Sequence, residues 1–100
     1  MSSPQAKQRV IINSTSIPRL ADQIRLHHDK AREQWVLLAP ERVLELAGPA
    51  VDIIRQCDGA KTVANIVTQM SAEYNAPENE IQSDILEMLQ SLLDKRFLQL

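Results

Sequence analysis

Few residues in this 100-residue chain are of the kinds that build specialised structures: it has one cysteine, two glycines and three aromatic residues. The single cysteine, Cys57, cannot form an internal disulfide, which favours a reducing compartment. Two glycines, Gly48 and Gly59, are too few for the glycine-rich loops that hold phosphates. Three aromatic side chains are too few for a base-stacking surface. The composition therefore excludes a disulfide scaffold, a phosphate-binding loop and an aromatic platform for nucleic acid.

Long apolar runs are also missing. The N-terminal segment contains only a three-residue apolar run, residues 10–12, far shorter than the roughly 7–15 apolar residues of a signal peptide core. No run approaches the roughly 20 residues of a membrane-spanning helix. We therefore expect a cytoplasmic protein that has no membrane partner.

The net charge of −2 is unevenly distributed along the chain. Residues 1–46 carry seven Lys or Arg and five Asp or Glu, a net charge of +2, whereas residues 47–100 carry four and eight, a net charge of −4. Contacts to a polyanion need clustered Lys and Arg side chains. The second half is therefore poorly suited to bind nucleic acid.

Three short segments have the pattern of β-strands, because their apolar and polar residues alternate or because they are rich in β-branched and aromatic residues. These segments are residues 23–28, 34–39 and 42–46. The polar residues 29–33 would join the first two as a hairpin. In the third segment, Val43 and Glu45 would lie on the face opposite Leu44 and Leu46. The sequence predicts a small three-stranded antiparallel sheet.

Three helices are predicted after the sheet, at about residues 49–58, 63–74 and 77–95. Apolar residues spaced at i, i+3, i+4 and i+7 mark one face of each. Thr62 has the position of an N-cap, and Gly59 suits the left-handed residue after a helix. The predicted fold is α+β, a three-stranded sheet plus a three-helix bundle, with the outline of a winged helix-turn-helix. We assign residues 1–16 to a flexible N-terminal arm and residues 17–100 to one domain.

Candidate catalytic and metal-binding residues are few. His27 and His28 would point to opposite faces of a strand, so they are poorly placed to share a metal. Cys57 lies on the apolar face of the first helix, where a cysteine acts as a small hydrophobic residue. The carboxylates of the third helix are typical of a solvated face. We therefore expect no enzyme activity, no metal and no cofactor.

Two functions of different classes remain. A winged helix-turn-helix can bind DNA through its last helix, but that helix then needs basic residues. Residues 77–96 contain five acidic residues and only two basic ones, Lys95 and Arg96, at the C-terminal end. The charge therefore disfavours DNA binding and favours the alternative, a protein that binds peptides.

A small sheet can bind an extended peptide by adding it as a further strand at an open edge. The third strand is the candidate edge, with Arg42, Val43, Leu44, Glu45 and Leu46. The third helix would form the other wall through Ile81, Asp84, Ile85 and Met88. Each of these apolar residues, taken alone, is better explained as part of the core.

Four motifs of the chain resemble the coenzyme PQQ synthesis protein D (PqqD) family. They are P-R-L-A at residues 18–21, R-L-H-H-D at 25–29, W-V-L-L-A-P-E at 35–41 and C-D-G-A-K-T-V at 57–63. The resemblance extends over about residues 17–98. The chain departs from the family pattern at residues 22–23 and 47–49.

The resemblance implies a non-catalytic peptide chaperone in the biosynthesis of pyrroloquinoline quinone. Such a protein would hold the precursor peptide PqqA for PqqE, a radical S-adenosylmethionine enzyme. In related recognition elements the peptide pairs with the third strand and rests against the third helix. Acidic residues of the peptide would then meet Arg25 or Arg42. An open strand edge can also pair with a second copy, so a homodimer remains an alternative to a monomer.

Overall fold

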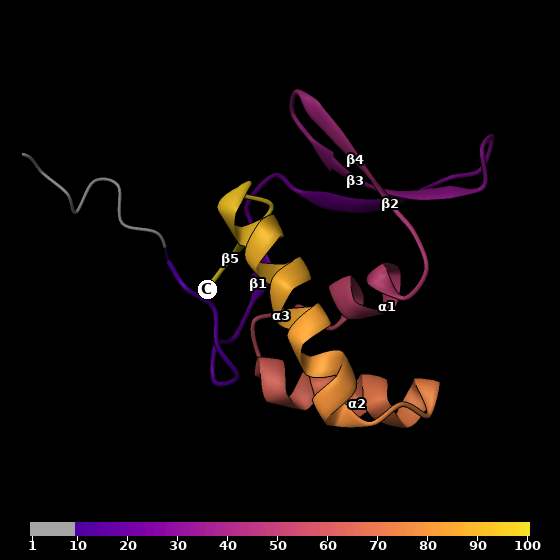
Figure 1. Ribbon diagram of the computed structural model, residues 1–100. Helices are drawn as coiled ribbons and strands as arrows, with labels where there is room; N and C mark the ends of the chain where they lie inside the picture. Colours follow the sequence, from indigo (N-terminus) through magenta and orange to yellow (C-terminus); the bar gives the residue numbers. More distant parts are fainter. Residues whose placement is uncertain (1–9) are drawn as a thin grey trace, which may run out of the picture.

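The computed structural model describes residues 10–100. Its elements follow in the order β1 (Arg19–Leu20), β2 (Arg25–Asp29), β3 (Gln34–Ala39), β4 (Arg42–Leu46), α1 (Ala50–Arg55), α2 (Val63–Tyr74), α3 (Glu78–Asp94) and β5 (Leu98–Gln99). Figure 1 shows β2, β3 and β4 on one side of the molecule and the three helices on the other. The predicted α+β arrangement of a three-stranded antiparallel sheet and three helices is confirmed.

The three-stranded sheet has the order β2-β3-β4, with both pairs antiparallel. The carboxylate of Asp29 accepts hydrogen bonds from the backbone N–H groups of Ala31 and Arg32 at 3.1 and 3.4 Å, which closes the turn between β2 and β3. β3 and β4 have the predicted bounds. β2 begins later than predicted because Gln23, with a φ of 70°, belongs to the preceding turn.

Alternate side chains of each strand face the helices or the outer side of the sheet. Leu37, which has no exposed surface, pairs with Leu26 and Leu44, and these leucines face the helices. Val43 and Glu45 lie on the outer face, as predicted, and Val43 is 64% exposed. The inner face of the sheet is therefore its apolar face.

The two histidines lie on opposite faces of β2, as predicted. The ring of His28 is 4.8 Å from the ring of Trp35, measured between centroids, whereas His27 is exposed. The guanidinium of Arg55 lies 4.7 Å above the ring of Trp35. Because Arg55 belongs to α1, this cation–π contact fixes the sheet against the first helix.

A left-handed turn connects β4 to α1. Gly48 has a φ of 60°, and Pro49 precedes the first residue of the helix. The predicted start of α1 is confirmed, but α1 ends at Arg55 rather than close to Gly59. The backbone N–H groups of Gln56 and Cys57 donate to carbonyls three residues earlier, those of Ile53 and Ile54, so the last turn is tighter than an α-helix.

The start and end of α2 agree with the prediction. The hydroxyl oxygen of Thr62 accepts a hydrogen bond from the backbone N–H of Asn65 at 3.1 Å, and the Asn65 side chain accepts one from the backbone N–H of Thr62 at 3.3 Å. This reciprocal capping box satisfies two donors at the helix start. Asn75, with a φ of 51°, ends the helix in the left-handed conformation.

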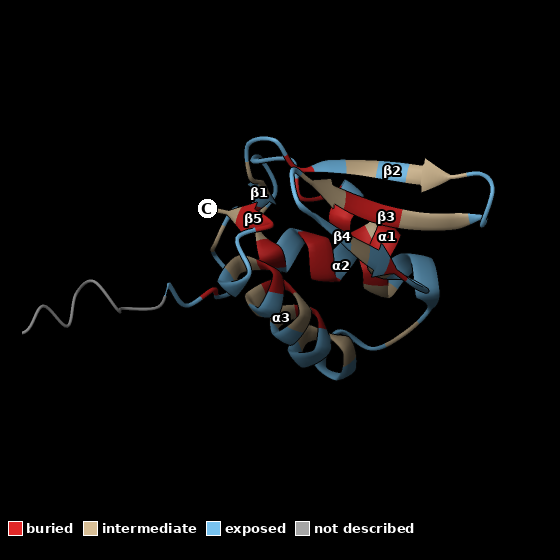
Figure 2. Ribbon diagram, turned by 90° about the horizontal axis from the view of Figure 1, so that it is seen from above, coloured by how far each residue is buried: buried red, intermediate tan, exposed pale blue. Residues whose placement is uncertain are grey.

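α3 is the longest helix and packs mainly against α2. Ile85, Leu89 and Leu92 are buried, one turn apart, while its first turn carries Glu78 and Glu80. Figure 2 shows the buried residues gathered where the helices and the sheet meet. This amphipathic pattern leaves part of α3 next to the sheet without covering the edge of β4.

Two short strands near the ends of the chain form a second, separate sheet. Arg19 pairs with Gln99, and Leu20 pairs with Leu98. Phe97, the residue directly before β5, is 2% exposed and lies 4.4 Å below the guanidinium of Arg42, the first residue of β4. Neither strand was predicted from the sequence. A two-residue strand is too short to show alternation, and its partner lies at the opposite end of the chain.

Residues 10–16, part of the predicted arm, make ordered contacts with α2 and α3. The backbone N–H of Ile12 donates to the side-chain oxygen of Gln90 at 2.9 Å, and the amide nitrogen of Gln90 donates to the carbonyl of Val10 at 2.8 Å. The carbonyls of residues 14 and 16 accept hydrogen bonds from the first turn of α2. Residues 1–9 lie outside the described part, so the arm itself stays a prediction.

Candidate functional site

A groove of about 350 Å³ lies between β4 and α3. We call it the β4–α3 groove. Its lining residues come from the strand, from the turn into α1 and from one face of α3: Leu44, Glu45, Leu46, Ala47, Ala50, Asp84, Glu87, Met88, Ser91, Leu92 and Lys95. β4 is an edge strand, since no strand among residues 10–100 pairs with the side that faces away from β3. An unpaired backbone edge thus stands beside a partly apolar helix.

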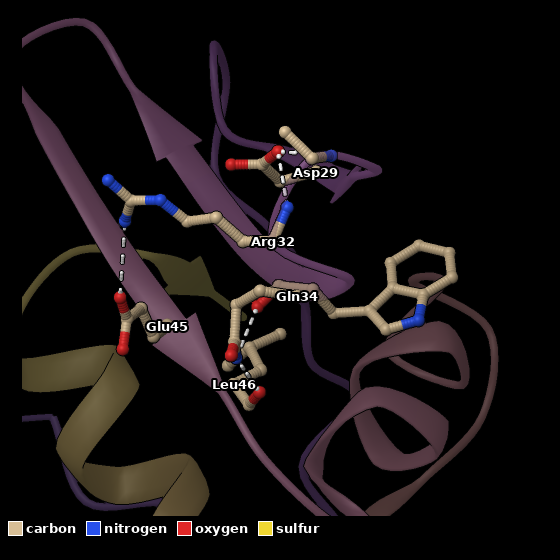
Figure 3. Close-up of polar contacts among 7 residues, drawn as sticks. Asp29, Arg32, Gln34, Glu45 and Leu46 are labelled. Atoms are coloured by element: carbon tan, nitrogen blue, oxygen red, sulfur yellow. Dashed lines mark hydrogen bonds and ion pairs between the residues drawn. The ribbon is translucent and has the colours of Figure 1, made fainter.

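The sequence of β4 positions the strand wall of the groove. Leu44 and Leu46 point toward the helices because they alternate with Val43 and Glu45. The side-chain amide of Gln34 donates to the carbonyl of Leu46 at 2.6 Å, which fastens the end of β4 to β3 (Figure 3). The strand therefore ends at a defined residue, directly before the turn into α1.

The charged side chains of the groove are mostly acidic. Glu45, Asp84 and Glu87 line it, against one cation, Lys95. Glu45 also lies 3.9 Å from the guanidinium of Arg32, which reaches across the sheet from the hairpin turn (Figure 3). That pair is exposed and therefore weak. A groove of this charge does not suit the phosphates of DNA.

A second cavity, of about 320 Å³, lies between the three helices. We call it the helical cavity. Its lining residues are almost all apolar: Ala47, Pro49, Ala50, Ile53, Met70, Tyr74, Ile81, Asp84, Ile85 and Met88. Four of them, Ala47, Ala50, Asp84 and Met88, also line the β4–α3 groove. The cavity and the groove therefore adjoin each other.

The hydroxyl of Tyr74 donates to the carboxylate of Asp52, which joins the C-terminal end of α2 to α1 beside the helical cavity. This hydrogen bond, followed by partial desolvation and the charges of Asp52 and Glu73, raises the pKa of the Tyr74 hydroxyl above its ordinary value. The tyrosine ring is thus held at the rim of the cavity while its polar group is satisfied.

The outer face of the sheet carries a third concavity, of about 550 Å³. It is lined by side chains of β2, β3 and β4 and by Arg32 of the hairpin turn. No helix residue contributes to it, so it is bounded only by the sheet and its hairpin turn. The β4–α3 groove, although smaller, is the better candidate for holding an extended chain because it has two walls and an open backbone edge.

The structure brings five of the predicted site residues together in the β4–α3 groove. They are Leu44, Glu45, Leu46, Asp84 and Met88. Two more, Ile81 and Ile85, line the helical cavity instead, and Ile85 is only 4% exposed. Contact between a peptide and these residues stays a prediction.

The remaining three predicted residues lie away from the groove. Val43 points to the outer face, and Arg42 stacks on Phe97. Arg25 lies on β2, at the opposite edge of the sheet from β4. Because β3 separates the two edges, Arg25 is poorly placed to meet a peptide bound at β4.

Several groove residues were not predicted from the sequence, notably Glu87, Ser91 and Lys95. Their spacing in the sequence could have identified them. Counted from Asp84, the three residues follow at i+3, i+7 and i+11, and Met88 lies at i+4, which places all of them on one face of the helix. Extending the predicted wall of α3 by two turns would have found them.

The described residues offer little to catalysis or to metal binding. Burial, followed by the negative charge of Asp58, raises the pKa of the Cys57 thiol to about 12, so Cys57 stays protonated and unreactive at neutral pH. Among residues 10–100, no three His, Cys, Asp or Glu side chains cluster as metal ligands would. Within the same range, no helix is both long and apolar enough to cross a bilayer.

Comparison with known protein families gives a match to the model of coenzyme PQQ synthesis protein D over residues 34–98. The chain belongs to the PqqD family. The matched region begins with β3 and includes all of β4 and α3, hence both walls of the β4–α3 groove.

Curated relatives in the PqqD family agree in sequence over most of the chain. A PqqA binding protein of Rhodopseudomonas palustris (strain BisB5) is 42% identical over 93% of this chain and 91% of its own length. A PqqA binding protein of Xanthomonas campestris pv. campestris (strain 8004) is 44% identical, covering 89% of this chain and 97% of the relative.

Two solved PqqD structures share the fold. The solution structure of the PqqD truncation of Methylobacterium extorquens PqqCD, described as a functional, stand-alone recognition element for ribosomally made, modified peptides, is 38% identical with a TM-score of 0.77. It covers 89% of this chain and 95% of its own. The crystal structure of Xanthomonas campestris PqqD is 44% identical with a TM-score of 0.58, covering 89% and 99%.

Proposed function

We propose that this protein binds the precursor peptide PqqA in the β4–α3 groove and presents it to the modifying enzyme PqqE, a radical S-adenosylmethionine enzyme, without catalysing a reaction itself. The observation that carries the proposal is the open edge of β4 opposite α3. Membership of the PqqD family, whose curated relatives are named PqqA binding proteins, supports the identity of the peptide.

The groove supplies the two kinds of interaction that peptide recognition needs. Backbone N–H and C=O groups along the edge of β4 pair with any extended peptide. Leu44, Leu46 and Met88 offer apolar surface to every second side chain of that peptide. Backbone pairing provides affinity, and the side-chain contacts provide selectivity.

A non-catalytic role agrees with the chemistry of the described residues, and the single cysteine, which cannot form an internal disulfide, supports a location in the cytoplasm. The one thiol is buried with a raised pKa. His27 and His28 lie on opposite faces of β2, and His28 packs on Trp35. The chemistry then belongs to PqqE, and this protein contributes the position of the peptide.

Two serines of α3 provide a matched test of the groove. Both are exposed, but Ser91 lines the β4–α3 groove while Ser83 lines none of the cavities described above. A tryptophan at residue 91 would fill the groove. We expect Ser91→Trp to weaken PqqA binding at least tenfold, about 1.4 kcal/mol, and Ser83→Trp to leave it within about twofold.

Calorimetric titration of each variant with synthetic PqqA measures these affinities. Equal binding by Ser91→Trp and the wild type would rule out the groove, and no binding by the wild type would rule out the function. PqqE assays complete the test. The wild type should accelerate modification of PqqA by PqqE, Ser91→Trp should not, and the protein alone should leave the mass of PqqA unchanged.

A further inference from the structure

We infer that the helical cavity is an anchor pocket for one large apolar or aromatic side chain of the bound peptide, adjoining the segment that pairs with β4. This inference rests on the proposed function and deepens it, because it names a chemical requirement that the peptide must meet. The backbone pairing at β4 accepts many sequences, whereas a pocket of defined size selects among them.

The position of the cavity supports a side chain of the peptide as its occupant. Ala47, Ala50, Asp84 and Met88 line both the cavity and the β4–α3 groove, so a chain lying in the groove passes its mouth. The mouth lies where β4 ends. A peptide residue beside Leu46 is the last one that β4 can pair, and the next inward-facing side chain reaches the cavity.

The size and the walls of the cavity specify the kind of side chain. A volume of about 320 Å³ is at the lower limit of the roughly 300–1,000 Å³ of small-molecule pockets, which suits a single side chain better than a cofactor. Ile53, Met70 and Ile85 are each at most 5% exposed and form an apolar floor. The thioethers of Met70 and Met88 adapt to different shapes and make favourable contacts with aromatic rings.

Of the side chains that line the cavity, only those of Tyr74 and Asp84 are polar. The hydroxyl of Tyr74 is occupied by Asp52, so it does not offer a free donor to a polar occupant. Asp84 is exposed and belongs equally to the groove. An apolar occupant therefore buries no unpaired polar group, whereas a polar side chain would lose its hydration without finding a partner on the apolar floor.

Methionine methyl groups report the groove and the cavity separately. Met88 lines both, whereas Met70 lines only the cavity. We would titrate protein labelled with methyl-¹³C methionine with synthetic PqqA, after assigning the signals with Met70→Leu and Met88→Leu. The expected result is a shift of both signals. A shift of Met88 alone would overturn the anchor pocket and leave the proposed function intact, whereas no shift of either signal, with no heat of binding, would contradict the proposed function.

An alanine scan of the large apolar residues of PqqA then locates the anchor. Alanine at the anchor should weaken binding roughly ten- to a hundredfold, as expected for losing a buried large apolar side chain. It should abolish the shift of Met70 and keep that of Met88. If every alanine peptide still shifts Met70, the signal reports an indirect change and the inference fails.

A filled cavity gives an independent test on the protein side. Ile81 lines only the cavity and is half-buried, so Ile81→Trp occupies the space from its open side. We expect this variant to bind PqqA about tenfold more weakly, and to bind the alanine-anchor peptide as the wild type does. Asn79→Trp, at an exposed site outside the cavity, is the control. Full affinity of a folded Ile81→Trp for unmodified PqqA would refute the anchor pocket.

Discussion

Two adjacent isoleucines test whether the folded domain begins before residue 17. Ile11 is 60% exposed, whereas Ile12 is 6% exposed and belongs to the hydrophobic core. Truncation of a buried Ile to Ala costs about 2–5 kcal/mol. Ile12 is slightly exposed rather than completely buried, so we expect Ile12→Ala to lower the free energy of unfolding by about 2–3 kcal/mol, the lower part of that range. Ile11→Ala should change it by less than about 0.5 kcal/mol.

Urea unfolding followed by circular dichroism measures both changes. With a slope of roughly 1–1.5 kcal/mol per molar urea for a small domain, the midpoint of Ile12→Ala should fall by roughly 2 M, with an unchanged slope. The backbone contacts of residues 10 and 12 to Gln90 remain in both variants, so the comparison isolates the side chains. Identical midpoints for the two variants would show that residue 12 is not packed in solution and that the domain starts later.

Two further predictions concern single hydrogen bonds. Asp52 raises the pKa of the Tyr74 hydroxyl, so the neutral phenol stabilises the folded state. This stabilisation is complete below pH 10.0, the ordinary pKa of tyrosine, and is lost as the pH rises through the pKa of Tyr74 in the folded protein. Tyr74 is the only tyrosine, so tyrosinate absorbance should show one transition, with its midpoint above pH 10.0. Asp52→Asn should move this midpoint back toward pH 10.0. A wild-type midpoint at or below pH 10.0 would contradict the contact. Thr62→Ala removes the cap of α2 and should lower the free energy of unfolding in urea by about 1 kcal/mol. Thr68 is exposed inside the same helix, so Thr68→Ala should not change this free energy measurably. Equal effects of the two substitutions would argue against the capping box.

Local signals predicted most of the fold. Composition placed β3 and alternation placed β4 at their observed bounds, and Thr62 marks the start of α2 because its side chain caps the helix. The acidic character of α3 was visible as well. Each of these features depends on residues that are neighbours in the chain.

The parts that escaped prediction depend on contacts between distant residues. β1 and β5 pair across almost the whole chain, and two-residue strands carry no pattern of their own. The place of Arg25 at the far edge of the sheet depends on strand order, which alternation does not determine. The helical cavity arises from the way three helices pack, and its residues, such as Ile53 and Met70, have the same pattern as core residues.

The pairing of β1 with β5 has a consequence for how the protein could be joined to others. It brings Arg19 beside Gln99, and residues 10 and 12 bond to Gln90 of α3, so both ends of the described chain lie on the side of α3 and β5 rather than at the edge of β4. Neighbouring termini of this kind tolerate covalent linkage to another domain. The related Methylobacterium extorquens structure is itself the PqqD truncation of a larger protein, PqqCD. A tether at either end would therefore leave open the edge of β4, where we propose that the peptide binds.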